Sequence, residues 1–193
     1  MNSGNRFLAL LERDGPALLD GGLATQLEAQ GCEINDALWS AGLLLTAPQE
    51  IVNAHRAFID AGAECVATAG YQASREGFAQ KGLSADEADA LMLKSIDLVR
   101  QAATEADKDV AVAASLGPYG AMLHNGSEYH GDYGVDGKTL RRFHEVRFDV
   151  LENANVDVVA LETIPSLQEA TALARVLDGR ATPAWISFSC RDG

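Results

Sequence analysis

The chain has 193 residues, of which 47% are hydrophobic, and this composition supports one substantial core and excludes a disordered protein. With 15 Lys and Arg against 28 Asp and Glu, its formal net charge of -13 disfavours nucleic acid and anionic membrane as partners. Its apolar runs fall far short of the roughly 20 residues of a membrane span, and the one near the N-terminus is too short for a secretory leader. We therefore expect a cytoplasmic protein.

Short apolar runs alternate along the chain with longer segments of helical period, a pattern typical of parallel βα units. The predicted strands are Ala17–Asp20, Glu64–Ala69, Val110–Ser115, Asp157–Leu161 and Ala184–Ser189. Helices are predicted where a hydroxyl residue is followed three positions later by Glu or Gln, the pattern of a capping box. Four pairs fit: Thr25 with Glu28, Thr46 with Gln49, Ser84 with Glu87, and Ser166 with Glu169. A further long helix is predicted over about residues 138–153.

The order of these elements predicts an α/β fold with a parallel sheet. Two closures compete, an open doubly wound sheet and a (β/α)8 TIM barrel. Gly193 directly follows the fifth predicted strand, so no helix covers that strand. We therefore expect residues 1–193 to be one C-terminally incomplete barrel domain that contains about the first five βα units.

In either closure, functional groups belong at the carboxyl ends of the strands. Asp20 and Glu162 are carboxylates at the ends of two different strands, where they would bind an ammonium group or act as acid and base. The alternative is that both only cap helices or solvate loops. Gly21 and Gly22 follow Asp20, and their N–H groups would receive a carboxylate, unless they form only a tight turn.

Other candidates carry weaker signals. The long segment 117–137 is rich in Gly and Tyr, which favours a lid or a binding loop over disorder. Within it, His124 and His130 are interpreted as solvated loop residues rather than metal ligands. The three cysteines are an odd number without metal-ligand spacing, so we expect reduced thiols; they are Cys32, Cys65 and Cys190.

Eight phrases, most of them at or near the predicted strand ends, form a recognisable set: DGGLATQLE (20–28), LWSA (38–41), GYQAS (70–74), SLGPYGAML (115–123), GSEY (126–129), GDY (131–133), ETIPS (162–166) and WISFSC (185–190). Together they resemble the homocysteine S-methyltransferases, most closely the bacterial branch that uses S-methylmethionine or S-adenosylmethionine. This resemblance extends over nearly the whole chain and suggests that the chain is the N-terminal portion of such an enzyme.

The resemblance implies a (β/α)8 barrel in which zinc binds the thiol of homocysteine, and the resulting thiolate takes a methyl group from a sulfonium donor to give methionine. It also implies that Asp20 and Glu162 hold the amino group of homocysteine and that Gly21 and Gly22 receive its carboxylate. Trp39, which is otherwise typical of half-buried packing at a helix end, would line the pocket together with Tyr71.

The zinc site itself is expected to lie outside this chain. In the family, one zinc cysteine follows the sixth strand and two adjacent ones lie near the eighth, beyond Gly193, so no metal ligand and no catalytic residue is assigned in the chain. The alternative hypothesis is a naturally short, noncatalytic amino-acid-binding or interaction protein. In that case its open sheet edges would favour self-association.

Overall fold

The computed structural model describes residues 4–34 and 38–190. Within them, four parallel strands form a single sheet in the order β1-β2-β3-β4. Their bounds are Cys65–Ala67 for β1, Ala111–Leu116 for β2, Val158–Ile164 for β3 and Ala184–Phe188 for β4. These four predicted strands are confirmed, with β3 extending beyond its predicted end.

The first predicted strand, Ala17–Asp20, is wrong, since this segment forms only an isolated parallel bridge between Leu19 and Cys65. Hydrogen bonds join the segment to the first strand at Asp20 N–H and at the carbonyl of Leu18. Leu18 and Leu19 are more than half exposed, so little burial stabilises a longer pairing. The bridge still places this segment next to β1, on the side away from β2.

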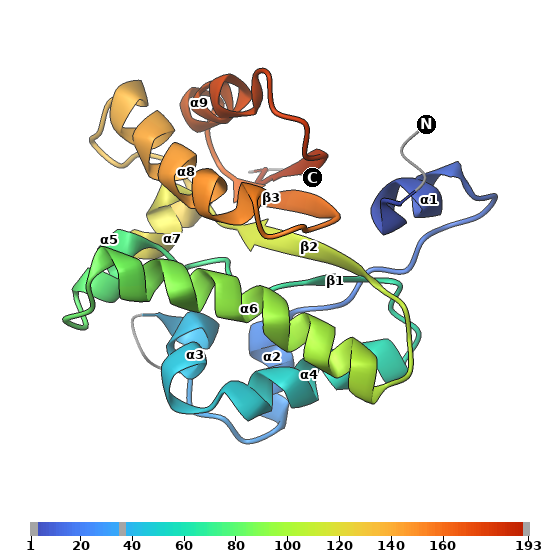
Figure 1. The fold of residues 1–193 in the computed structure, drawn as a ribbon. Helices are drawn as coiled ribbons and strands as arrows, with labels where there is room; N and C mark the ends of the chain where they lie inside the picture. The colour runs from blue at the N-terminus through green and yellow to red at the C-terminus, as the bar shows by residue number, and fades with distance from the viewer. Residues whose placement is uncertain (1–3, 35–37, 191–193) are drawn as a thin grey trace.

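The helical segments precede β1 or lie in the connections between the strands (Figure 1). Those before β1 are α1 (Arg6–Glu12), α2 (Leu23–Ala29), η1 (Trp39–Gly42), α3 (Leu43–Thr46) and α4 (Pro48–Asp60). Those after β1 are α5 (Arg75–Ala79), α6 (Ala85–Glu105), α7 (Tyr119–Leu123), η2 (Ser127–Tyr129), α8 (Gly137–Glu152) and α9 (Leu167–Leu177). The segment 117–137 is thus an ordered connection that contains α7 and η2. Across the described part of the chain, no helix is long and apolar enough to cross a bilayer.

Two of the four predicted capping pairs begin helices as expected. Ser84 and Glu87 form a complete capping box on α6, and the Ser166 hydroxyl accepts the Glu169 N–H at the start of α9. The predictions at Thr25 and Thr46 are wrong. Gly22 is the N-cap of α2, and α4 begins at Pro48, whose fixed φ and missing N–H suit the first position of a helix.

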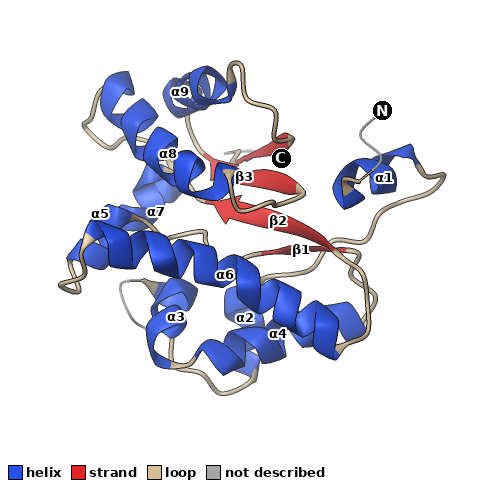
Figure 2. Cartoon of the chain, in the orientation of Figure 1, coloured by secondary structure: helices blue, strands red, loops and turns tan. Residues whose placement is uncertain are grey.

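The two faces of the sheet carry different side chains. Large apolar residues such as Val112 and Leu161 point into the main core with the connecting helices, while small ones such as Ala113 and Ala160 form a second cluster. Phe7 of α1 packs on this second cluster, and Figure 2 shows α1 set apart from the other helices. Sequential strand order without a switch point is the order of a (β/α) barrel, so the barrel prediction is favoured and the doubly wound alternative is wrong.

Candidate active site

A cavity of about 500 Å³ opens at the carboxyl ends of the strands. Its wall is built by the segment after the Leu19 bridge, by η1, and by residues that end or follow each of the four strands. All six residues singled out from the sequence lie in this wall: Asp20, Gly21, Gly22, Trp39, Tyr71 and Glu162. The structure therefore brings together groups that are separated by up to 142 positions in the chain, from 20 to 162.

Asp20 is fixed by the sheet. Its Oδ2 accepts the Ala67 N–H at 2.8 Å, and its own N–H donates to the Cys65 carbonyl at 3.1 Å, so the carboxylate projects where β1 ends. Burial, together with the nearby negative charge of Glu162, raises the pKa of Asp20 to about 7. Near neutral pH this carboxyl group therefore exchanges a proton readily.

Glu162 lies near the end of β3 and faces the same cavity. Its Oε2 accepts the Ser115 hydroxyl at 2.5 Å, which orients the carboxylate from the neighbouring strand β2. Burial raises the pKa of Glu162, although the Ser115 hydrogen bond opposes that shift. No Lys or Arg is among the described residues that line the cavity, so the two carboxylates favour a cationic ligand such as an ammonium group.

The glycine pair lies in the same wall, between Asp20 and the start of α2. No hydrogen bond within residues 4–34 and 38–190 uses the N–H of Gly21 or Gly22. Both groups are therefore available to donate to a ligand carboxylate, as the resemblance implies.

Two aromatic side chains complete the predicted set. Trp39 is 37% exposed, has a positive φ of 45°, and packs edge-on against the His124 ring with centroids 6.0 Å apart. Burial raises the pKa of Tyr71 to about 12, so its phenol stays neutral at physiological pH. The cavity wall thus combines acidic groups with aromatic surface.

Other residues also line the cavity, including Gln72, Thr163 and Ser187. Gln72 and Thr163 follow predicted strands in the sequence, but none of the three was predicted to bind a ligand. Thr163 has a φ of 60°, a left-handed conformation that β-branched residues rarely adopt. Its N–H donates to the Ser187 hydroxyl, which ties β3 to β4 beside Glu162. The sequence signal for Thr163 is its position directly after Glu162, which follows a predicted strand.

Glu169 was predicted only as part of a capping box, but its carboxylate connects α9 to the segment 117–137 and to α8. This fully buried carboxylate accepts the Tyr119 N–H at 2.6 Å and the Tyr133 hydroxyl at 2.7 Å, and it lies 2.7 Å from His144 Nε2. Burial lowers the pKa of His144. Glu169 therefore orders the segment 117–137. The capping box predicted a hydrogen bond from its carboxylate back to Ser166, but the carboxylate instead bonds Tyr119, Tyr133 and His144.

The residues present do not fit a metal. Among residues 4–34 and 38–190, no three His, Cys, Asp or Glu side chains are grouped as ligands. Cys65 is buried in β1, where burial raises its thiol pKa to about 12, while Cys32 is partly buried and Cys190 is exposed. His124 and His130 are exposed, and the latter accepts the Asp132 N–H.

A sequence model of the homocysteine S-methyltransferase family matches residues 17–193. The chain belongs to this family. It is 44% identical to the homocysteine S-methyltransferase of Escherichia coli over its whole length, 45% identical to homocysteine S-methyltransferase YbgG of Bacillus subtilis over 91% of its length, and 42% identical to a selenocysteine Se-methyltransferase of Brassica oleracea over 95%. The chain spans 64%, 59% and 58% of these relatives, respectively.

Solved homocysteine S-methyltransferases share the fold. The metallated form of the E. coli enzyme MmuM superposes with a TM-score of 0.89 at 42% identity, covering 97% of this chain and 68% of that one. The apo form of the same enzyme gives a TM-score of 0.74 over 97% of this chain and 65% of that one. The cavity described above thus lies in a fold that is shared with family members that bind metal.

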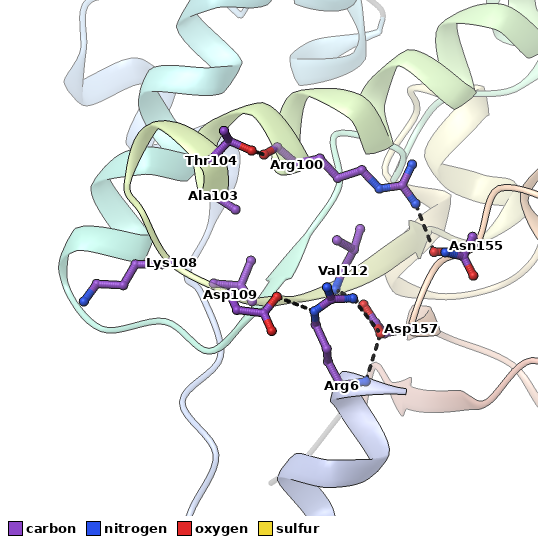
Figure 3. Close-up of a pocket in the computed structure, with 10 residues that line it drawn as sticks. Arg6, Arg100, Ala103, Thr104, Lys108, Asp109, Val112, Asn155 and Asp157 are labelled. Atoms are coloured by element: carbon purple, nitrogen blue, oxygen red, sulfur yellow. Dashed lines mark hydrogen bonds and ion pairs between the residues drawn. The ribbon is translucent and has the colours of Figure 1, made fainter. Parts of the chain in front are cut away.

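A second cavity of about 360 Å³ lies near the amino ends of β2 and β3, away from the family site (Figure 3). Its charged groups mostly satisfy one another. The Arg6 guanidinium forms an ion pair with Asp109, and the backbone N–H of Arg6 donates to the Asp157 carboxylate. The Arg100 guanidinium donates to the carbonyl of Asn155. Because residues at this end of a barrel serve stability, we assign the cavity no role in the chemistry.

Proposed function

We propose that this chain forms the homocysteine-binding part of a methyltransferase that moves a methyl group from a sulfonium donor to the homocysteine sulfur. The observation that carries the proposal is the convergence of Asp20 and Glu162, with no cationic side chain beside them, on a cavity also lined by Gly21 and Gly22. An α-amino acid needs two subsites, one acidic for its ammonium and one with free N–H donors for its carboxylate, and this wall offers both.

In this function, Asp20 and Glu162 bind the ammonium group, and the N–H groups of Gly21 and Gly22 bind the carboxylate. Trp39 and Tyr71 cover the aliphatic part and limit access of water. The side chain of homocysteine then extends along the cavity, and its sulfur is held for in-line attack on the methyl group of the donor. Homocysteine reacts as its thiolate, after the thiol proton has left to solvent. A bond forms between the thiolate sulfur and the methyl carbon, the carbon–sulfonium bond breaks, and its electron pair neutralises the donor sulfur.

The zinc that the resemblance implies has no ligand group within the described residues, so the contribution of this chain is binding and orientation. S-methylmethionine and S-adenosylmethionine are the donors we propose. The test joins this chain to the remaining part of the E. coli relative and measures methionine formed from homocysteine with each donor. We expect zinc-dependent methionine formation that Asp20→Asn with Glu162→Gln abolishes, whereas an active double variant would contradict the assigned roles.

The alternative, a noncatalytic amino-acid-binding protein, draws support from the absence of a metal-ligand group among residues 4–34 and 38–190. β4 also leaves Ile186 and Phe188 exposed at the sheet edge, which would favour self-association in that case. The same experiment separates the two functions. A chimera that binds homocysteine and contains zinc but forms no methionine would favour the alternative.

A further inference from the structure

Arg147 of α8 is a charged residue that is buried beside apolar side chains. Arg147 lies on the inward face of α8 between Phe143 and Phe148, and it is only 1% exposed. Arginine is almost never fully buried unless its donors are paired. Burial lowers its pKa to about 10, so the guanidinium stays charged at neutral pH.

The guanidinium of Arg147 is satisfied entirely by backbone carbonyls of two loops. Nε donates to Ala73 at 2.9 Å, Nη1 to Gly117 at 2.8 Å, and Nη2 to Gly70 at 3.1 Å and to Tyr71 at 2.9 Å. No carboxylate among residues 4–34 and 38–190 has a hydrogen bond with it. A planar fork of donors is suited to hold several carbonyls in one fixed arrangement, and the Phe143 ring lies 4.9 Å beneath it.

These two loops are pressed together where Arg147 holds them. The Gly117 N–H donates to the Tyr71 carbonyl at 2.9 Å, and a Cβ on Gly117 would lie 2.6 Å from that oxygen. Likewise, a Cβ on Gly70 would lie 2.5 Å from the Ser115 carbonyl. The Tyr71 peptide is therefore confined between the end of β2 and the guanidinium, while the Tyr71 side chain lines the cavity.

We propose that Arg147 is a positioning residue that acts on amino-acid binding through Tyr71. By holding the carbonyls on both sides of the Tyr71 peptide, it keeps this side chain against the cavity rather than letting the loop after β1 relax outward. The expected effect on homocysteine affinity rests on the proposed function.

The test is a double-mutant cycle on the 193-residue chain, with homocysteine affinity measured by calorimetry. Because hydrogen bonds from a charged group contribute strongly, Arg147→Met should weaken binding at least about tenfold. If Arg147 acts through Tyr71, the same change should weaken binding less than about twofold when Tyr71→Ala is already present. Equal losses in both backgrounds, or no loss in the wild-type background, would overturn the proposal.

Arg180→Met is the matched control, since Arg180 also stacks on a phenylalanine of α8, Phe148, but bonds Asp149 and Glu152 instead of the site loops. It should leave affinity unchanged. If Arg147→Met does not fold, Arg147→Lys carries the test. A lysine keeps the charge but does not span both loops, so we expect a folded protein with affinity reduced about threefold or more; wild-type affinity would overturn the proposal.

A readout without ligand separates this proposal from the proposed function. With fluorotyrosine incorporated, and the Tyr71 signal assigned by Tyr71→Phe, Arg147→Lys should shift or broaden the ¹⁹F resonance of Tyr71, while Arg180→Met should not. An unchanged resonance would refute positioning by Arg147. A wild-type chain that binds no homocysteine would instead refute the proposed function, and the fluorine signal would still decide the role of Arg147.

Discussion

Homocysteine should bind this chain more tightly as the pH rises from 6 to 8. The ammonium group needs an ionised Asp20, and burial raises the pKa of that carboxyl from 3.8 to about 7. Asp20 is then about one-tenth ionised at pH 6 and about nine-tenths ionised at pH 8, so affinity should increase about tenfold. A carboxyl with an ordinary pKa would be fully ionised at both values, and affinity would not change.

Calorimetry at pH 6, 7 and 8 measures this effect, and repeating it in buffers of different ionisation enthalpy counts the protons released on binding. The thiol of the ligand also titrates, near pH 8.5, so 2-aminobutyrate is the control ligand, with the same ammonium and carboxylate groups but no thiol. Both ligands should show the rise. Asp20→Asn should bind weakly and nearly independently of pH.

The same pKa predicts a stability effect of defined sign. A raised folded-state pKa stabilises the fold below about pH 4, and this contribution is lost as the pH rises through about 7. Asp20→Asn should therefore gain stability relative to wild type as the pH rises from 4 to 8, by up to about 4 kcal/mol before solvent screening in the open cavity. Flat affinity between pH 6 and 8, together with a constant stability difference in urea unfolding, would refute the reasoning.

Three further substitutions test the scaffold by urea unfolding. Gly70→Ala should destabilise by about 1–3 kcal/mol and weaken homocysteine binding, because its Cβ would lie 2.5 Å from the Ser115 carbonyl; normal stability would show that β1 and β2 can separate there. Asp157→Ala should cost about 2 kcal/mol without changing affinity, because it leaves the Val112 N–H unpaired; reduced affinity would connect the second cavity to the site. Ser84→Ala should cost about 1 kcal/mol, and no loss would mean that the capping box of α6 is redundant.

The sequence was sufficient to predict the order of the elements, because each β-branched run predicts a buried strand and each apolar stripe of helical period predicts a helix packed on the core. It also predicted residues that line one cavity, since parallel strands end at one rim and the polar groups after each run must meet there. The edge segment Ala17–Asp20 was overestimated because Leu18 and Leu19 remain more than half exposed beside a single neighbouring strand. Apolar composition alone does not reveal whether a strand has a partner on both sides.

For two buried residues, Glu169 and Arg147, local sequence patterns do not identify the interaction partners. Glu169 fits a capping box in sequence, yet its carboxylate turns inward to Tyr119 and Tyr133, which are 50 and 36 positions away. Arg147 lies within the apolar stripe of α8, and a charge at such a position was an available signal that something polar must meet it. Its partners are backbone carbonyls of other units, and no side-chain pattern specifies those.

A crystal structure of this chain with homocysteine bound would test the assigned binding roles directly. We expect the ammonium nitrogen within hydrogen-bond distance of the carboxylates of Asp20 and Glu162, and the ligand carboxylate on the N–H groups of Gly21 and Gly22. Homocysteine bound in the reverse orientation, or in the cavity at the amino ends of β2 and β3, would contradict it.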